Sequence, residues 1–323
     1  MTNRWTDEPG PRLRDVSEDE LLAQIFPLLP RGGPVVVAPG DDTALVRTAY
    51  GSVLATTDTM VRGRDWLDEW SSPADVGGKA VAQNVADIAS MGGRATALLV
   101  TLVANPETPV AWVLDFAAGL GAAAGEIEVP VAGGDLSSAP AGTLMVSITA
   151  LGDVEGDPVL RSGARVGDVV AVAGTLGRSA AGLVLLQQDR AEADEDLVRE
   201  HVRPRPPYEQ GPVARSAGAT AMIDLSDGLV RDAGRVAAAS GVRLELSTEL
   251  LGADLDRLAG VLDADAAREC VLTGGEEHSL LACFPPEVAL PDGWRRIGQV
   301  LEGEGVTVDG RPRSGGGWDH FHP

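Results

Sequence analysis

The sequence predicts an α/β (α+β) protein of two domains, each with its own sheet and helices. The chain has 323 residues, which suits two domains of about 150 residues better than one. Strand-like apolar segments alternate with helical patterns, and this alternation restarts near residues 152–158. The predicted division is a flexible N-terminal tail (residues 1–16), a first domain (17–152) and a second domain (153–323).

The first domain is expected to begin with a short helix, because Ser17-Glu-Asp-Glu20 has the S-x-x-E pattern of a capping box. Ser72 and Pro73 are typical of a second helix start, and that helix runs to Gly92-Gly93. The other expected elements are strands at 35–39, 52–58, 96–104, 131–135 and 143–152, and a helix around 109–123.

The second domain is expected to contain a proline-rich surface connection at 203–210. AMIDLSDGL (221–229) reads as a strand that passes into a helix. Further strands are predicted at 168–174, 242–246, 278–284 and 305–310, with a helix at 179–188.

The charge balance excludes several classes of partner. Lys plus Arg is 26 and Asp plus Glu is 48, which gives a net charge of −22. Such a chain repels nucleic acid and acidic membrane surfaces, and it tolerates counter-cations. We therefore expect no nucleic-acid partner and no membrane partner.

The cysteines and the N-terminus favour a cytoplasmic protein. Cys270 and Cys283 form no C-x-x-C pair and no zinc spacing. The first twenty residues are charged and lack an apolar signal region. The longest apolar stretch, near residues 95–104, is too short to span a bilayer.

Acidic residues recur at strand ends and on one helix. Each has an ordinary explanation alone, such as a turn at Gly-Asp-Asp or at Gly-Gly-Asp. Together they form an oxygen-only set without a neighbouring histidine, which argues against zinc and favours Mg²⁺ with phosphate. The set comprises Asp42, Asp58, Asp87, Asp135, Asp224 and Asp227, with hydroxyls from Thr56, Thr57 and Ser226.

The helix at 73–91 combines a core face with a polar row. Lys79, Gln83 and Asp87 are spaced i, i+4, i+8, and such a row is ordinarily the solvent-facing surface. Asn84, three residues before Asp87, is a poor helix former. Both interpretations of this row stay open from the sequence.

No known phosphate-binding loop accompanies the acids. The chain has no G-x-x-x-x-G-K-[ST] motif, and Lys79 is its only lysine. GTLGRSAAG (174–182) lacks the G-x-G-x-x-G spacing, so we interpret it mainly as a close-packing turn. A bound nucleotide would need Mg²⁺, backbone N–H groups and an arginine such as Arg161, which alone could equally be a surface residue.

An ordered series of motifs resembles the thiamine-monophosphate kinases. The motifs are GDDTALV, TTDTMVRGRDW, KAVAQNVADIASMGG, AGGDLS, RSGARVGDVVAVAGTLGRSAAGL, IDLSDGL, GGEE and GWDHF. The resemblance covers roughly residues 17–323. These kinases belong to an ATP-binding superfamily with aminoimidazole ribonucleotide synthetase and selenophosphate synthetase.

The resemblance implies that ATP and thiamine monophosphate give thiamine diphosphate and ADP, with several Mg²⁺ ions bound. It implies an N-terminal domain that pairs through its sheet in a homodimer, followed by a C-terminal α/β domain. The metal ligands would be Asp42, Thr56, Thr57, Asp58, Asp87, Asp135, Asp224 and Asp227. ATP would contact Gly134, Asp135, Arg161 and Ser226, and the substrate would contact Asp65, Glu276 and Trp318.

The chain departs from the family pattern at two places. Asp65 stands where histidine is usual, and Glu277-His278-Ser279 stands where Asp-Tyr-Glu is usual. These changes bear on substrate contact. Trp318 could instead be packing, and Glu276 could cap a turn.

The chemistry agrees with the resemblance, because a phosphate monoester is already anionic near neutral pH and needs no strong general base. Direct, in-line phosphoryl transfer with metal assistance is expected, without an acid–base residue. The alternatives are a sister ATP-dependent synthetase, of the aminoimidazole ribonucleotide or selenophosphate type, and a non-enzymatic acidic cation-binding protein. Asp232, further into the helix after Asp227, is interpreted as an ordinary surface acid.

Overall fold

The computed structural model describes residues 10–37, 43–313 and 316–317. Most of the expected N-terminal tail lies outside these ranges, as do residues 38–39 of the expected strand at 35–39. The chain divides into unit 1 (residues 1–88 and 95–153) and unit 2 (residues 89–94 and 154–323). In the described ranges, no helix combines the length and the apolar character needed to cross a membrane.

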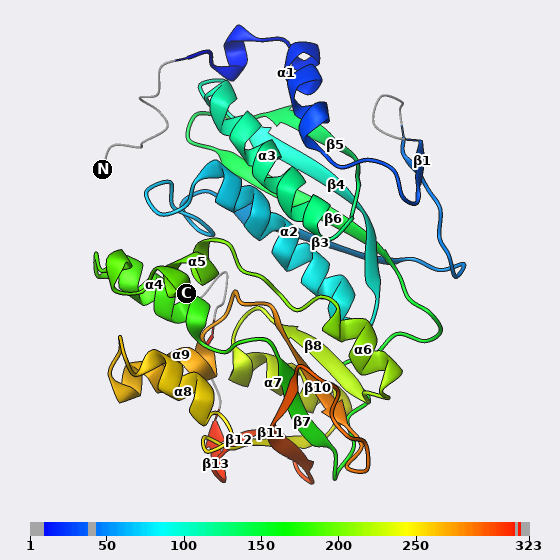
Figure 1. Cartoon of the computed structure of the whole chain (residues 1–323), viewed down its shortest axis with the longest axis vertical. Coiled ribbons are helices and arrows are strands. Elements are labelled where there is room, and N and C mark those ends of the chain that lie inside the picture. Colours follow the sequence, from blue (N-terminus) through cyan, green and yellow to red (C-terminus); the bar gives the residue numbers. More distant parts are fainter. Residues whose placement is uncertain (1–9, 38–42, 314–315, 318–323) are drawn as a thin grey trace. The chain divides into compact units, whose positions relative to one another are not determined.

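Unit 1 is built on a four-stranded sheet in the order β3-β6-β4-β5. Strands β3 and β6 are antiparallel, whereas β4 and β5 are parallel. Helices α2 and α3 lie on one face of this sheet (Figure 1). The elements are η1 (Leu13–Asp15), α1 (Glu18–Ile25), η2 (Phe26–Leu28), β1 (Val35–Val37), β2 (Leu45–Val46), β3 (Leu54–Val61), α2 (Pro73–Ser90), β4 (Arg94–Ala104), α3 (Val110–Glu126), β5 (Val131–Ser138) and β6 (Leu144–Asp153).

Both predicted helix starts of unit 1 are confirmed. The Ser17 hydroxyl accepts from the Glu20 N–H, and the Glu20 carboxylate accepts from the Ser17 N–H. The Ser72 hydroxyl likewise accepts from the Asp75 N–H at 3.2 Å, and the Asp75 carboxylate accepts from the Ser72 N–H. These reciprocal bonds satisfy N–H groups that a helix start otherwise leaves unpaired.

Two glycines allow α2 and α3 to touch along their backbones. A Cβ added to Gly77 would lie 2.4 Å from the Phe116 carbonyl oxygen, and one added to Gly119 would lie 2.1 Å from that of Ala74. No side chain larger than hydrogen fits at either position. The crossing fixes α2 against α3, and α2 carries the predicted site residue Asp87.

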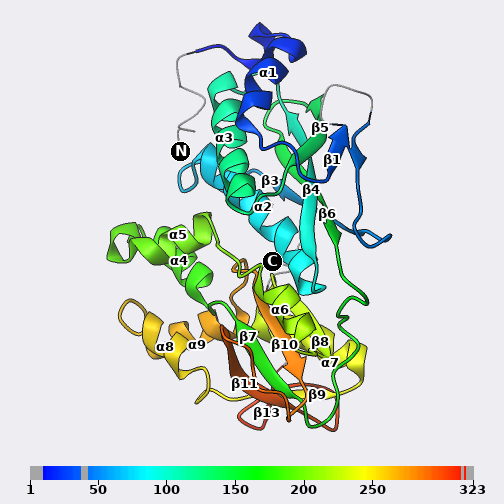
Figure 2. The same cartoon turned by 45° about the vertical axis from the view of Figure 1, so that its right-hand side comes forward.

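Unit 2 is built on a seven-stranded sheet in the order β13-β12-β9-β11-β7-β10-β8. Its neighbours are antiparallel except for β12 and β9, which are parallel. Figure 2 shows helices of this unit beside the sheet. The elements are β7 (Val169–Ala173), α4 (Arg178–Gln187), η3 (Ala191–Ala193), α5 (Glu195–Val202), α6 (Gln210–Ser216), β8 (Ala221–Leu225), α7 (Leu229–Ser240), β9 (Arg243–Leu246), α8 (Gly252–Leu258), α9 (Ala264–Thr273), β10 (Ser279–Phe284), β11 (Trp294–Leu301), β12 (Gly305–Val308) and β13 (Arg311–Arg313).

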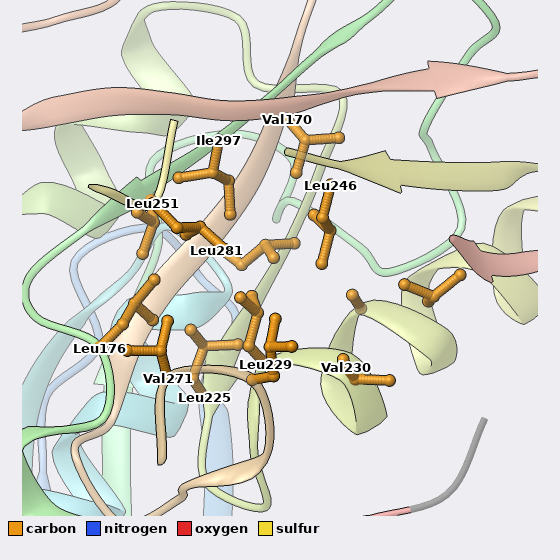
Figure 3. Close-up of a cluster of buried hydrophobic side chains, with 14 of the residues drawn as sticks. Val170, Leu176, Leu225, Leu229, Val230, Leu246, Leu251, Val271, Leu281 and Ile297 are labelled. Carbon is orange, nitrogen blue, oxygen red and sulfur yellow. The ribbon is translucent and has the colours of Figure 1, made fainter. Parts of the chain in front are cut away.

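The core of unit 2 consists mainly of aliphatic side chains. Leu225 from β8, Leu229 from α7 and Leu281 from β10 lie together in it (Figure 3). Burying such side chains contributes about 1.5–3 kcal/mol each. Ala, Val and Leu predominate in this core, which also includes the two free and buried cysteines, Cys270 and Cys283.

The sequence did not predict several elements of unit 2. Helices α5, α6, α8 and α9 are short, and strand β11 contains a register shift between Arg296 and Gly298. A register shift breaks the alternation by which a strand is recognised. Short helices have weak periodic signals and depend on tertiary packing.

Candidate functional site

Strand β3 and helix α2 bring three predicted ligand residues together in unit 1. The Thr56 hydroxyl donates to Asp87 Oδ2 at 2.6 Å. The Asp58 backbone N–H donates to Asn84 Oδ1 at 3.0 Å, one helical turn before Asp87. Side chains alternate along a strand, so Thr56 and Asp58 share the face of β3 that is turned toward α2. Thr56, Asp58 and Asp87 therefore form one oxygen-rich group.

The polar row of α2 is buried at two positions. Lys79 is 3% exposed and Asn84 is 1% exposed. The Asn84 side chain also donates to the Ala80 carbonyl at 2.9 Å, so the helix backbone holds it in place. The alternative interpretation of this row as a solvent-facing surface is wrong for Lys79 and Asn84, because both pack inside unit 1.

Thr57 lies on the opposite face of β3. Its hydroxyl donates to the Ile148 carbonyl at 3.0 Å and accepts from Thr149 at 3.3 Å. On strand β5, the exposed Asp135 accepts from the Ser137 hydroxyl at 2.6 Å. No described bond links either residue to the group of Thr56, Asp58 and Asp87, so their roles as metal ligands stay predictions.

Gly134 is required by the pairing of β5 with β4. A Cβ at this position would lie 1.9 Å from the Val100 carbonyl oxygen. Gly134 and Asp135 also line a cavity of about 990 Å³ in unit 1. Its walls include apolar side chains such as Leu22, Phe116 and Leu120.

Asp65 follows β3 in a loop that is fixed at two points. Its carboxylate accepts from the Val61 N–H at 2.6 Å. Its carbonyl accepts from the Lys79 ammonium at 3.1 Å. The chain's single lysine thus holds the loop that carries a predicted substrate contact.

The second set of acids lies at the turn from β8 into α7 in unit 2. Asp224 is 3% exposed, and its Oδ2 lies 3.1 Å from His278 Nδ1. Asp227 pairs with Arg235, and Arg231 Nε lies 3.9 Å from the same Asp227 oxygen. Arginines from the first turns of α7 therefore reach back to the acids of this turn. Ser226 lies between the two acids and is partly buried.

Asp232 corrects the sequence interpretation. It was expected to be a surface acid, but it is fully buried, at 0% exposure. Its Oδ2 accepts from the N–H groups of Asp227 and Gly228, both at 3.0 Å, and its Oδ1 pairs with Arg235. Burial raises the pKa of Asp232 to about 7. The buried carboxylate thus provides the acceptor for two backbone N–H groups of the turn that precedes α7.

The GGEEH segment, which precedes β10, contacts the same turn. The Glu276 N–H donates to the Ser226 carbonyl at 2.9 Å, and the His278 N–H donates to the Leu225 carbonyl at 3.1 Å. Glu277 accepts hydrogen bonds from the start of α4, and burial raises its pKa to about 7. Sequence analysis named Glu276 as a substrate contact, and it noted Glu277 and His278 only as departures from the family pattern.

For three remaining predicted residues, no described contact tests the predicted role. Arg161 is exposed, and its carbonyl accepts from the Ser240 hydroxyl at 2.8 Å. Asp42 and Trp318 lie outside the described residues. Their roles stay predictions.

The donor chemistry of the set in unit 1 suits Mg²⁺ better than a transition metal, because its grouped atoms are carboxylate and hydroxyl oxygens. In unit 2, His278 lies beside Asp224, so the expectation of acids without a neighbouring histidine is wrong there. Within residues 10–37, 43–313 and 316–317, no group of three or more His, Cys, Asp or Glu side chains is placed to hold a metal ion. A site here would therefore need hydroxyls, water and phosphate oxygens as further ligands, which is usual for Mg²⁺.

The two units match two adjacent family models. Residues 40–154 match the AIR synthase related protein, N-terminal domain, and residues 165–311 match the AIR synthase related protein, C-terminal domain. The protein is thus of the AIR synthase-related class. A solved Escherichia coli HypE structure has the same fold, with a TM-score of 0.71 at 18% identity, covering 92% of this chain and 97% of that one.

Relatives that match almost the whole chain identify the family within this class. The thiamine-monophosphate kinase of Mycobacterium tuberculosis is 44% identical over 317 residues, covering 97% of this chain and 94% of that protein. A solved structure described as AaThiL complexed with AMPPCP and TMP covers 97% of this chain and 100% of that one, at 34% identity and a TM-score of 0.78. The chain belongs to the thiamine-monophosphate kinase family. The predicted family and two-domain α/β fold are confirmed.

Proposed function

We infer that this protein transfers a phosphoryl group from ATP to thiamine monophosphate, giving thiamine diphosphate and ADP. The observation that carries the inference is the 44% identity, over 97% of the chain, to a thiamine-monophosphate kinase. The similar solved complex contains AMPPCP and TMP, which correspond to the two substrates of this reaction.

Mg²⁺ ions accompany the substrates. The proposed ligands are Asp42, Thr56, Thr57, Asp58, Asp87, Asp135, Asp224 and Asp227. Bound Mg²⁺ would neutralise two polyanions that otherwise repel each other. The contact between Thr56 and Asp87 supports this proposal, because it places two oxygen donors 2.6 Å apart on β3 and α2.

Gly134, Asp135, Arg161 and Ser226 contact ATP, and Asp65, Glu276 and Trp318 contact thiamine monophosphate. The loop of Asp65 is held by Lys79, which supports a fixed role for it. Glu276 is an acid that suits the cationic thiazolium ring of the substrate.

The protein chain supplies no general base, because the acceptor phosphate is already anionic near neutral pH. Its residues position the two phosphates for in-line attack. The transfer is direct, without a phosphoenzyme. Inversion of configuration at a chiral γ-phosphate is therefore expected, and retention would contradict direct transfer.

The homodimer forms through the sheet of unit 1. Thr57 and Thr59 are exposed on the face of β3 opposite α2. Light scattering at micromolar concentration tests this proposal, and a monomeric mass would contradict it. A cytoplasmic location stays a prediction.

Acceptor profiling tests the proposed reaction. The purified protein is supplied with Mg-ATP and, separately, thiamine monophosphate, thiamine, selenide or formylglycinamidine ribonucleotide. We expect thiamine diphosphate from thiamine monophosphate and little ATP use with the other three. Turnover with selenide or the ribonucleotide alone would instead indicate a sister synthetase, and Mg²⁺ binding without turnover a non-enzymatic protein.

A further inference from the structure

Three turns of unit 2 are joined by hydrogen bonds and close contacts. They are residues 174–178 before α4, 226–228 before α7 and 274–278 before β10, and we call them the turn junction. A Cβ at Gly275 would lie 2.1 Å from the Ser226 carbonyl oxygen, and one at Gly228 would lie 2.3 Å from that of Thr273. Because backbone touches backbone at these points, no side chain larger than hydrogen fits at Gly228 or Gly275.

The segment 274–278 has a constrained backbone. Glu276 has φ of 64° and His278 has φ of 52°, and neither is glycine. Residues with side chains occupy this left-handed region at a cost of about 1 kcal/mol each. The conformation persists because surrounding groups hold the segment, including the Ser226 and Leu225 carbonyls that accept from Glu276 and His278.

Glu277 lies between these two residues and anchors the segment. It is 3% exposed. One carboxylate oxygen accepts from the Thr175 hydroxyl at 2.9 Å and from the Arg178 N–H at 2.8 Å. The other accepts from the Gly177 N–H at 2.5 Å. The carboxylate thus ties the segment to the first turn of α4, where helix N–H groups favour a negative charge.

The two neighbours of Glu277 in the chain contact two different parts of the proposed site in unit 2. Glu276 is a proposed contact of thiamine monophosphate. Its side chain is 38% exposed, and its Oε2 lies 3.6 Å from His201 Nδ1. His278 contacts Asp224, a proposed metal ligand. Glu277 is buried between them and cannot touch the substrate, so any role in the reaction acts through its neighbours.

We propose that Glu277 is a positioning residue that holds Glu276 in place to recognise thiamine monophosphate. The inference rests on the proposed function. The glutamate fixes the segment 274–278 to α4, and the fixed backbone aims the Glu276 side chain. Loss of the anchor frees Glu276 to leave its left-handed conformation, and this weakens binding of the acceptor.

The kinetic test compares Glu277→Gln with a matched control. Glutamine keeps the size, but its amide nitrogen turns a donor toward the N–H groups of α4. We expect the KM for thiamine monophosphate to rise by about 10- to 100-fold, while the KM for ATP changes less than about twofold. Glu277→Asp keeps the charge, and its KM for thiamine monophosphate is expected to lie between those of the unmodified protein and of Glu277→Gln.

The control is Asp168→Asn, at the opposite end of β7. Asp168 is also 3% exposed, and it accepts from the Arg165 N–H at 2.9 Å and the Thr220 hydroxyl at 2.5 Å. Its loss costs stability in a similar way but leaves the turn junction intact. An equal rise in KM for Asp168→Asn, or an unchanged KM for Glu277→Gln below its melting temperature, would overturn the proposal.

A milder variant covers the case in which Glu277→Gln fails to fold. In Thr175→Val, the valine side chain has nearly the same shape as threonine but lacks the hydroxyl. The substitution therefore removes one of the three hydrogen bonds to Glu277. A smaller rise in the KM for thiamine monophosphate is expected, again with little change for ATP. A KM equal to that of the unmodified protein would contradict the anchoring role.

Hydrogen exchange without substrate separates this inference from the proposed function. Amide exchange should quicken together in residues 174–178 and 274–278 of the Glu277 variant, and in neither segment of the Asp168 control. Unmodified protein that yields no thiamine diphosphate would contradict the proposed function alone. Unchanged exchange in both segments would overturn the anchoring role even with an active enzyme.

Discussion

Arg235 joins two carboxylates of the turn between β8 and α7. It pairs with Asp227 and with the fully buried Asp232. Acids this close repel one another unless a cation lies between them. Arg235, in the second turn of α7, supplies that cation.

Asp232→Asn tests the structural role of this buried acid. The amide cannot balance Arg235, and its nitrogen meets N–H groups that need an acceptor. We expect the free energy of unfolding to fall by about 1–3 kcal/mol, because the amide leaves a buried hydrogen-bonding partner of Asp232 unsatisfied, although Arg235 keeps its pair with Asp227. Urea denaturation measures it. The exposed Asp256→Asn on α8 should stay within about 0.5 kcal/mol, and equal values for both variants would contradict the assignment.

Asp87→Asn tests the metal role of α2. Asn can still accept from the Thr56 hydroxyl, so the fold should be retained. Turnover should fall by about 100-fold or more, because a metal ligand contributes several kcal/mol of charge stabilisation. Steady-state kinetics and circular dichroism measure the two effects. Asp115→Asn on the exposed side of α3 is the control, and normal turnover in Asp87→Asn would mean that this acid binds no essential metal.

At the residue scale, the sequence identified acids at strand ends but not what surrounds them. Thr56, Asp58 and Asp87 could be named within the larger candidate set, because residue type and position on a strand or helix are local features. The burial of Asp232 and Glu277 could not be predicted, because it depends on segments distant in the chain. The available signal for the burial of Asp232 was the spacing of two acids around the start of α7. Asp227 precedes the helix and Asp232 lies in its first turn.

At the element scale, α2 and α3 cross at Gly77 and Gly119. Gly119→Ala would place a Cβ 2.1 Å from the Ala74 carbonyl oxygen. The helices must separate, so we expect the free energy of unfolding to fall by about 2 kcal/mol or more. Gly125, on the same helix, has open space around it. Gly125→Ala should therefore raise stability by about 0.5–1 kcal/mol through helix propensity, and the opposite signs are read by thermal or urea unfolding.

The start of α5 is tied to α8 by an ion pair that responds to acid. Arg257 donates to both oxygens of Asp194, at 2.7 and 3.0 Å, and these bonds lower the Asp194 pKa below its usual value. A lowered pKa stabilises the fold above the unfolded value near 3.8, and the stabilisation is lost as the pH falls through the folded pKa.

Asp194→Asn should flatten this acid dependence. Asparagine still caps α5 but has no charge to titrate. Near neutral pH the variant should be less stable by up to about 1 kcal/mol, and the difference should shrink as the pH falls below 4. Urea midpoints across the acid range measure it. A difference that stays constant with pH would show that the ion pair contributes nothing.

Element prediction succeeded where periodicity was long and local. The start of α2 was predicted from Ser72 and Pro73, and β4 from its apolar run. Helices such as α5 and α9 were missed because they are short and depend on neighbours for stability. Strand β11 was missed because its bulge at Arg296–Gly298 interrupts alternation.

At the scale of the whole molecule, the net charge of −22 has two separable effects. General self-repulsion weakens the folded state, and any salt screens it. Specific Mg²⁺ sites add stability only when that ion binds, and this part saturates with concentration. Screening of the self-repulsion and binding of Mg²⁺ both raise the melting temperature, so a single titration with MgCl₂ does not separate them.

Titrations with NaCl and MgCl₂ at equal ionic strength separate charge screening from specific Mg²⁺ binding. NaCl should raise the melting temperature gradually, with no saturation at low concentration. MgCl₂ of equal ionic strength should add a further rise of about a few degrees that saturates, because ligand binding at about 100 times Kd contributes about 2.7 kcal/mol. Asp87→Asn should keep the NaCl response and lose part of the Mg²⁺ excess, since the variant changes the total charge little but removes a ligand. Identical Mg²⁺ and Na⁺ curves would mean that the acids act only through their summed field, and the proposed ligand set would then be wrong.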